Sequence, residues 1–167
     1  MITFPPCKIN LGLQVISKRP DGFHQLMSCF YPVPLQDILE VTPSQKFSFS
    51  QSGISIPDDG KKNLCVRAYE LLRAEYDLPP VAIHLHKIIP IGAGLGGGSS
   101  DAAYVLTTLD KIFSVGLSVE QLRNYASQLG SDCAFFVSEK PMLAMGRGEI
   151  QNAISVSLAG KFIVIVQ

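Results

Sequence analysis

The stretch PIGAGLGGGSSDAAY, residues 90–104, places five glycines within seven positions and two serines just before a helix-like run. Glycine permits backbone conformations that other residues resist and lets a ligand approach the main chain closely. Amides that lead into a helix start lack intrahelical partners and lie at the positive end of the helix dipole, so they attract anions. The stretch therefore predicts a polyphosphate site at a helix start, with Ser99 and Ser100 as hydroxyl donors that can also cap the helix.

Two other phosphate-binding loops compete with this interpretation. A P-loop requires a lysine before its final serine or threonine, and residues 92–101 contain no lysine. The dinucleotide fingerprint G-x-G-x-x-G is matched by Gly92, Gly94 and Gly97, but it also expects an acidic residue at the end of a second strand. Asp110 lies near the expected distance, inside a helical pattern. A dinucleotide-dependent oxidoreductase is therefore the weaker alternative.

The segments around the loop predict a single α+β domain. Extended patterns are expected at 7–18, 25–33, 37–43, 46–51 and 81–88, with a turn at 19–24 and a strand and turn at 144–149. Three helices are expected. One begins after an N-cap at Asn63, a second follows the glycine loop directly, and a third runs from a Ser118–Gln121 capping box to Gly130.

Both ends of the chain carry further patterns. In the first strand, Lys8 and Asn10 share one face, and the apolar residues Ile9, Leu11, Leu13 and Val15 share the other. At the other end, residues 162–167 read as a strand that has no partner in the chain. We therefore expect residues 1–160 to form a nucleotide-binding domain and residues 161–167 to begin a truncated second domain.

Composition excludes several classes of protein. The formal net charge is +0, and no basic stripe indicates a nucleic-acid partner. Apolar runs are too short for a membrane span, and no signal peptide opens the chain, so we expect no membrane partner. The four cysteines are widely and irregularly spaced, which favours a reducing, cytoplasmic location over a zinc or disulfide framework. His84 and His86 share a strand face, but the sequence indicates no third ligand that would complete a metal site with them.

Four segments together resemble the GHMP kinases, small-molecule kinases without a P-loop. The glycine loop resembles the signature of that superfamily. The segments CKINLGLQVISKRPDGFHQL, KNLCVRAYELL and LGSDCAFF resemble the branch that phosphorylates the 2-hydroxyl of 4-diphosphocytidyl-2-C-methyl-D-erythritol on the non-mevalonate route to isoprenoid precursors. The resemblance implies a fold like domain 2 of ribosomal protein S5, a mixed sheet with helices packed on one side. It also implies an ATP-dependent kinase, a transferase with a small-molecule substrate.

The resemblance assigns a catalytic pair. Asp132 matches the catalytic aspartate and is expected to act as general base toward the substrate hydroxyl; without the resemblance, a cap of a short helix is the simpler explanation. Lys8 matches the catalytic lysine. A lysine in an apolar strand is costly to bury unless it is paired, so we expect it to face Asp132; a lysine that snorkels from a strand edge is the alternative.

The resemblance also assigns the substrate side. Asn10 shares the face of Lys8 and is expected to contact the substrate. Phe23 and His24 match the turn that binds the cytosine. The family usually has a tyrosine where this sequence has Phe23, so stacking remains available and the hydroxyl is lost.

For the nucleotide, the resemblance implies that ATP binds along the glycine loop. Asn63 and Lys87 match positions near the adenine, although a helix cap and a surface lysine explain them equally well. Mg²⁺ is expected to arrive with ATP, without an assigned protein ligand, and Ser99 and Ser100 could approach it. The residues expected to bind ATP are Pro90, Ile91, Gly92, Ala93, Gly94, Leu95, Gly96, Gly97, Gly98, Ser99, Ser100, Asn63 and Lys87.

Two further functions remain open. Family members continue well beyond the length of this chain, so it could be a nucleotide-binding half without turnover. A related small alcohol could also replace the expected substrate.

Overall fold

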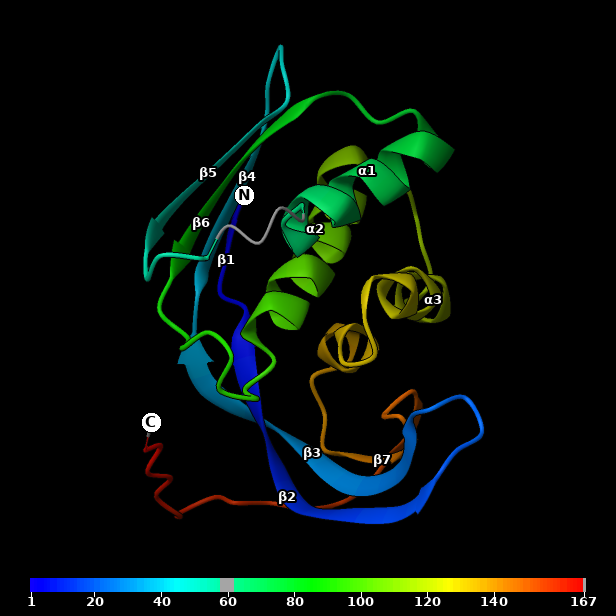
Figure 1. Cartoon of the computed structure of the whole chain (residues 1–167). Coiled ribbons are helices and arrows are strands. Elements are labelled where there is room, and N and C mark those ends of the chain that lie inside the picture. The colour runs from blue at the N-terminus through cyan, green and yellow to red at the C-terminus, as the bar shows by residue number, and fades with distance from the viewer. Residues whose placement is uncertain (58–61, 167) are drawn as a thin grey trace.

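The fold consists of two four-stranded sheets and three α-helices, as a computed structural model of residues 1–57 and 62–166 shows (Figure 1). The α+β class predicted from the sequence is confirmed. The first sheet has the order β1-β4-β6-β5 and is mixed, because β5 runs parallel to β6 whereas its other pairs are antiparallel. Its strands are β1 (Ile2–Thr3), β4 (Ile38–Pro43), β5 (Ser48–Gly53) and β6 (Val81–Lys87).

The extended patterns expected at 7–18, 25–33 and 144–149 correspond to strands of a second sheet, whose separation from the first was not predicted. It is antiparallel, with the order β2-β3-β7-β8, and a long hairpin of two 13-residue strands dominates it. Figure 1 shows this sheet curving beneath the helices. Its strands are β2 (Pro6–Lys18), β3 (His24–Gln36), β7 (Met142–Gly146) and β8 (Ile150–Ala153).

Each helix begins close to its predicted start. The helices α1 (Leu64–Tyr76) and α3 (Val119–Leu129) are capped by Asn63 and by the Ser118–Gln121 capping box, as expected. The helix α2 (Gly97–Phe113) follows the glycine loop, and a short 3-10 helix, η1 (Cys133–Val137), follows α3. None of the helices in the described ranges is long and apolar enough to cross a membrane.

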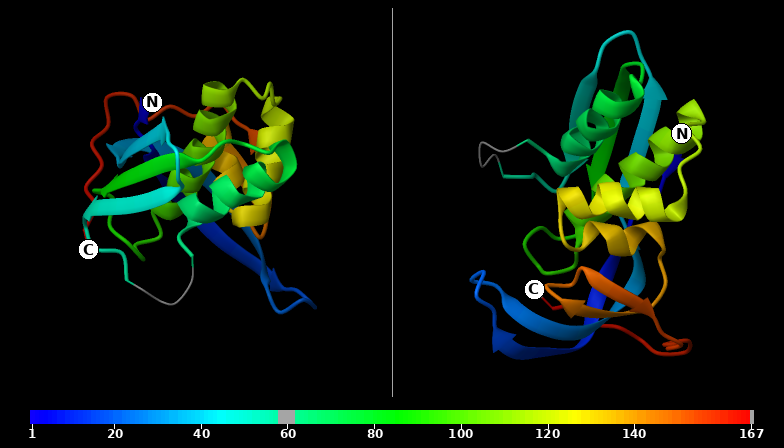
Figure 2. Two further views of the ribbon diagram at one scale, coloured as in Figure 1. Left: turned by 90° about the horizontal axis from the view of Figure 1, so that it is seen from above. Right: turned by 90° about the vertical axis from the view of Figure 1, so that its right-hand side faces the viewer.

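Three apolar clusters hold the described layers together, and the smallest joins β2 and β3 to the glycine loop through Cys7, Val33, Ile89 and Leu95. The main core lies between one face of the first sheet and the helices, which the two views of Figure 2 place on the same side of that sheet. Leu39 and Ile83 from the sheet and Leu72 and Leu106 from the helices are fully or almost fully buried there. A smaller core joins the second sheet to α2 and η1, where the rings of Phe30 and Phe135 make an edge contact. The glycine loop and η1 therefore lie where the two sheets meet.

Two expectations for the ends of the chain are wrong. In β2, a register shift between Leu11 and Leu13 interrupts the expected alternation, and the side chains of Leu13 and Val15 are 55% and 61% exposed. Residues 162–166 form no strand, since an exposed strand needs a neighbouring edge and no described strand pairs with them. Phe162 is fully exposed, and Gln167 lies outside the described residues.

Candidate active site

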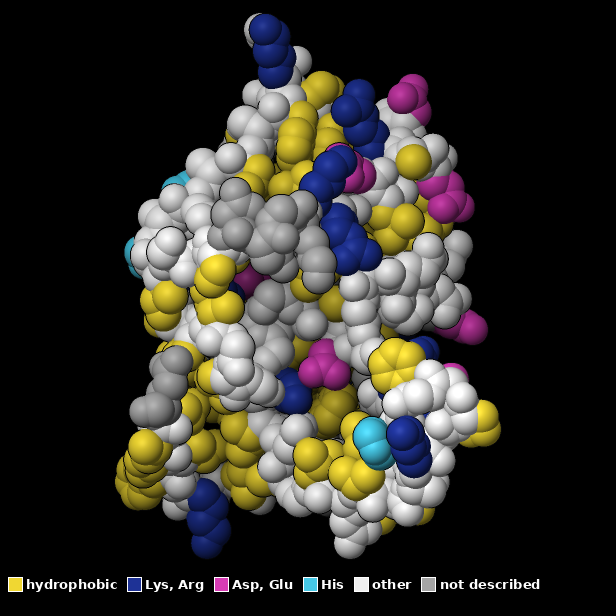
Figure 3. Space-filling model, in the orientation of Figure 1, with side chains coloured by type: hydrophobic (Ala, Val, Ile, Leu, Met, Phe, Trp, Pro, Cys, Tyr) yellow, Lys and Arg dark blue, Asp and Glu magenta, His cyan; other side chains and the backbone are white. Residues whose placement is uncertain are grey.

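A cavity of about 1050 Å³ opens at the junction of the two sheets. Figure 3 shows the hollowed face, with an acidic and a basic side chain beside each other beneath the helices. The cavity is lined by residues 90–99, by Asn63 at the start of α1, by Lys8 and Asn10 of β2 and by Asp132. Its volume is at the upper limit for small-molecule and cofactor sites, which span about 300–1,000 Å³.

Lys8 and Asp132 meet at this cavity, as predicted. The Nζ atom of Lys8 lies 3.5 Å from Oδ2 of Asp132 and donates a hydrogen bond of 3.0 Å to Oδ1 of Asn10. It also lies 4.7 Å from the centroid of the Phe30 ring. Lys8 is 4% exposed, so the snorkelling alternative is excluded, whereas the Asp132 side chain keeps 30% of its surface open to solvent. The site therefore places the buried ammonium group of Lys8 beside the partly exposed carboxylate of Asp132.

A hydrogen bond joins the glycine loop to the backbone of Lys8. The backbone amide of Lys8 donates a 2.9 Å hydrogen bond to the carbonyl of Leu95. Gly96 has a φ of +71°, and a Cβ atom added there would lie 2.9 Å from the Phe136 ring and 3.2 Å from the Lys8 side chain. A residue other than glycine would therefore be both strained and crowded at this point. By contrast, added Cβ atoms at Gly92 and Gly94 would meet nothing within 4 Å, which leaves open space above the loop.

The expectation that Ser99 or Ser100 caps α2 is wrong. The N-cap is Gly96, and no side chain in the described part of the protein caps this helix. Both serines lie inside the first turns, because the helix begins two residues before Ser99. Ser99 lines the cavity, whereas Ser100 is fully buried outside its lining and its hydroxyl has no hydrogen-bond partner among the described residues.

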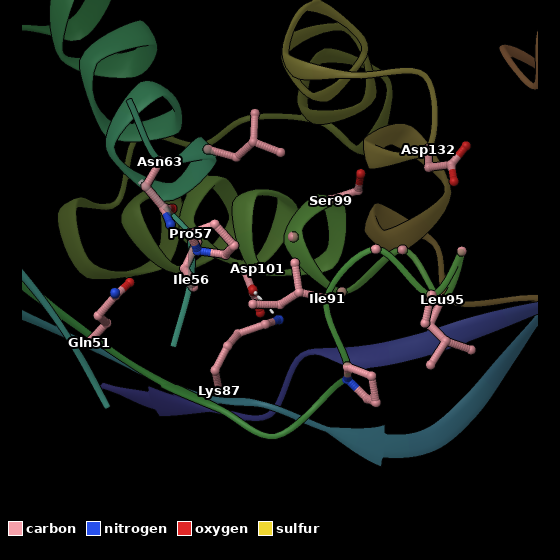
Figure 4. Close-up of a pocket in the computed structure, with 18 of the residues that line it drawn as sticks. Gln51, Ile56, Pro57, Asn63, Lys87, Ile91, Leu95, Ser99, Asp101 and Asp132 are labelled. Carbon is pink, nitrogen blue, oxygen red and sulfur yellow. Dashed lines mark hydrogen bonds and ion pairs between the residues drawn. The ribbon is translucent and has the colours of Figure 1, made fainter. Parts of the chain in front are cut away.

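Asn63 and Lys87 both line the cavity but already have structural partners. The side chain of Asn63 accepts a 2.9 Å hydrogen bond from the amide of Cys65, so it caps α1. Lys87 is 4% exposed, which rules out the surface lysine considered above. Its ammonium group forms ion pairs with Asp37 and with Asp101, the latter at 2.9 Å (Figure 4).

Phe23 and His24 lie apart from the main cavity. They line a separate hollow of about 370 Å³ together with Val15, Leu26, Ser131 and Arg147. The guanidinium carbon of Arg147 lies 4.8 Å from the centroid of the Phe23 ring. One face of this ring is therefore already covered by a cation, which the sequence did not indicate.

Two buried acidic residues beside the cavity were not predicted from the sequence. Asp37 and Asp101 are both fully or almost fully buried around Lys87. Burial raises the pKa of Asp101 to about 7, because desolvation and the neighbouring Asp37 outweigh the attraction of Lys87. Burial alone would lower the pKa of Lys87, but the charge of Asp101 and the hydrogen bonds to both carboxylates raise it. The position of Asp101 directly after the two serines was a signal that could have found it.

The four cysteines, His84 and His86 lie outside the lining of the main cavity. All four cysteines are free, and burial raises the pKa of Cys133, next to Asp132, to about 11, so its thiol stays protonated. His84 is bonded to the hydroxyls of Ser50 and Ser52, and His86 to that of Ser52. The described residues contain no group of three or more side chains of the types that bind metals.

Comparison with known proteins identifies relatives along the whole chain. Residues 63–140 match the family described as "GHMP kinases N terminal domain". The chain is 52% identical over its full length to the 4-diphosphocytidyl-2-C-methyl-D-erythritol kinase of Bacteroides fragilis strain YCH46, and 48% identical over 99% of its length to that of Cytophaga hutchinsonii. It covers 62% of each of these relatives.

Solved structures agree on the fold. The crystal structure of a 4-(cytidine 5'-diphospho)-2C-methyl-D-erythritol kinase, 37% identical, superimposes with a TM-score of 0.81 over 94% of this chain and 56% of that one. A mevalonate kinase that is 12% identical reaches 0.68 over 93% of this chain and 56% of its own, which indicates a shared fold alone.

Proposed function

We propose that this chain is a member of the GHMP kinases and the nucleotide-binding part of an ATP-dependent small-molecule kinase, because its residues 63–140 match the N-terminal domain of that family. The proposed reaction transfers the γ-phosphate of ATP to the 2-hydroxyl of 4-diphosphocytidyl-2-C-methyl-D-erythritol. Two relatives with the name of this kinase are 52% and 48% identical to the chain, which spans 62% of their length. The pathway would be the non-mevalonate route to isoprenoid precursors, in the cytoplasm.

The contact between Lys8 and Asp132 is the observation that carries this proposal. The partly exposed carboxylate of Asp132 can accept the proton of an alcohol that enters the cavity. Lys8, 3.5 Å away from that carboxylate, can polarise the same hydroxyl. A positioned carboxylate beside a cation can orient an alcohol and stabilise the charge of a transferred phosphoryl group.

The geometry of the loop supports ATP as the phosphoryl donor. ATP would supply the transferred phosphoryl group, and the amides of residues 92–98 would hold its phosphates at the start of α2. The open space above Gly92 and Gly94 permits this close approach. Asn63 and Lys87 lie on the cavity wall, where the nucleoside would extend. We assign no protein ligand to the Mg²⁺ that generally accompanies ATP, because the phosphates supply oxygen ligands themselves.

The acceptor side rests on Asn10, Phe23 and His24. Asn10 is already bonded to Lys8, so it can orient a substrate group toward the catalytic pair. The separate hollow that contains Phe23 and His24 is where the cytosine would bind. Since Arg147 lies over the Phe23 ring, a pyrimidine would stack on the free face or displace the guanidinium.

A radioactive transfer assay with [γ-³²P]ATP tests the proposal. The 167-residue chain and a chain of the relatives' full length would be compared with the diphosphocytidyl alcohol and with related small alcohols. We expect transfer to the diphosphocytidyl alcohol by the longer chain. If the longer chain transfers phosphate only to another alcohol, the proposed substrate is wrong; if it binds ATP without transfer to any alcohol, the proposed activity is wrong.

The same comparison addresses the second candidate, a nucleotide-binding half without turnover. The chain spans 62% of the length of the Bacteroides fragilis relative, so both lengths are assayed side by side. ATP binding without transfer by the 167-residue chain, beside an active longer chain, is the expected result for this candidate. Equal activity of both chains would rule it out.

A further inference from the structure

We propose that Asp37, Lys87 and Asp101 form a buried ionic clamp that holds the two ends of the glycine loop together and thereby sets the affinity for the nucleotide. In this assignment Lys87 is a positioning residue that acts through the loop, instead of a direct ligand of the adenine. The proposal rests on the proposed function only in taking the loop as the site of nucleotide binding.

The clamp joins the segments on either side of the loop. Lys87 is the last residue of β6, three residues before Pro90, and Asp101 lies in α2, just beyond the loop. The 2.9 Å ion pair between them therefore bridges the entrance and the exit of residues 90–96. A bridge across a loop restricts the conformations that the loop would otherwise sample.

Asp37 fixes the entrance further. Its Oδ1 atom accepts hydrogen bonds from the backbone amides of Ile88, at 2.5 Å, and Ile89, at 2.8 Å. Its other carboxylate oxygen pairs with Lys87. The backbone amide of Asp37 in turn donates a 3.0 Å bond to the carbonyl of Pro5, close to the start of β2. The carboxylate of Asp37 thus binds both the backbone at the start of the glycine loop and the ammonium group of Lys87, which in turn pairs with Asp101 beyond the end of the loop.

The packing at the exit of the loop requires the clamp to be in place. A Cβ atom added at Gly97 would lie 2.9 Å from Nζ of Lys87, so the first residue of α2 rests directly on the ammonium group. Removal of that group would leave a space beneath the helix start and two buried carboxylates without a cation. Such a loss strongly disfavours the native arrangement around the remaining charges.

The position of Asp37 separates this proposal from direct contact. Lys87 and Asp101 line the cavity, but Asp37 does not and is fully buried behind them. A change at Asp37 can therefore reach a bound nucleotide only through the clamp. Asp110 provides a matched control, because it lies in the same helix as Asp101, near the end that is far from the glycine loop. Its Oδ1 atom accepts a 2.9 Å hydrogen bond from the backbone amide of Leu117.

Calorimetric titration with adenylyl imidodiphosphate and MgCl₂ tests the proposal on the 167-residue chain. We expect D37N and K87M each to raise the Kd about tenfold, and D110N to leave it within about twofold. The double variant D37N/K87M should bind no more weakly than the weaker single variant, because both changes break the same unit. Binding stoichiometry reports the folded fraction, so a purely structural loss would lower the stoichiometry and leave the Kd unchanged.

Two results would overturn the clamp. An effect of K87M without an effect of D37N would make Lys87 a direct ligand, and an unchanged Kd in both would remove any role for the pair. If the wild-type chain binds no nucleotide at all, the proposed function fails together with the clamp; if it binds and the variants match it, only the clamp fails.

Discussion

The ammonium group of Lys8 lies 3.5 Å from a carboxylate oxygen of Asp132, although one residue belongs to β2 and the other precedes η1 near the far end of the chain. The backbone of Lys8 is also bonded to Leu95 in the glycine loop. The pair and the loop therefore form one continuous surface, in which a group bound at the loop faces the carboxylate.

Replacement of Asp132 by asparagine should abolish turnover and preserve nucleotide binding. The amide keeps the shape of the side chain but cannot accept the proton, and loss of a general base typically costs about 10²–10⁴ in rate. Phosphate transfer by the chain of the relatives' full length and calorimetric titration of ATP would measure the two effects. Turnover within a few fold of the wild type would remove the general-base role.

Replacement of Lys8 by alanine should lower kcat more than it raises KM for ATP. Lys8 contacts Asp132 and Asn10 through its side chain, whereas its bond to the glycine loop comes from the backbone and survives the change. Steady-state kinetics at varied ATP would separate the two constants. A change confined to KM would make Lys8 a binding residue.

Substitution of Gly96 by alanine should destabilise the fold, whereas G98A should not. At Gly96 the added methyl group combines a φ of +71° with a contact of 2.9 Å to Phe136, and such strain and overpacking cost about 1–3 kcal/mol each. At Gly98 the nearest atom would lie 3.8 Å away, and the position is helical. Urea unfolding of both variants measures the difference, and equal midpoints would contradict the packing described for the loop.

Asn63 should reveal its role through two substitutions. N63D keeps the oxygen that caps α1 but removes the amide donor, whereas N63A removes both and should cost about 1 kcal/mol of stability. If Asn63 also donates to the adenine, N63D should weaken ATP binding at nearly unchanged stability. Thermal unfolding together with calorimetry distinguishes these cases, and unchanged affinity in N63D would leave Asn63 as a cap alone.

Asp101 should make the stability of the protein depend on pH. Its pKa of about 7 means that the folded state keeps a proton that the unfolded chain releases near pH 4. The contribution of this group to the free energy of unfolding is therefore greatest in acid and declines as the pH rises to about 7. The titratable groups that face Asp101 are Asp37, Lys87 and Cys65. Burial raises the pKa of the Cys65 thiol well above its ordinary value, so this thiol does not titrate between pH 4 and pH 7.

The D101N variant removes this dependence. Its Tm relative to the wild type should rise between pH 4.5 and pH 7.5, because only the wild type loses the contribution of a protonated Asp101. Calorimetric melting at several pH values would measure the difference, and a constant difference would contradict the raised pKa.

Local signals predicted much of the fold correctly. Asn63 caps α1 and the Ser118–Gln121 box caps α3, because capping depends on residues only a few positions apart. Errors arose where a local signal competed with packing. Ser99 and Ser100 resemble caps, but α2 starts earlier, at Gly97, where a glycine N-cap and the close packing on Lys87 fix the backbone.

The sequence by itself determined that a glycine-lined helix start is present, because backbone freedom and helix polarity depend on neighbouring residues. It also placed Lys8 and Asn10 on one face of a strand. Only the tertiary structure decided that Asp37 and Asp101 enclose Lys87, that Arg147 covers Phe23, and that β2 exposes Leu13 and Val15. The physical reason is that burial and ion pairing depend on which distant segments pack together, and no short stretch of sequence records those contacts.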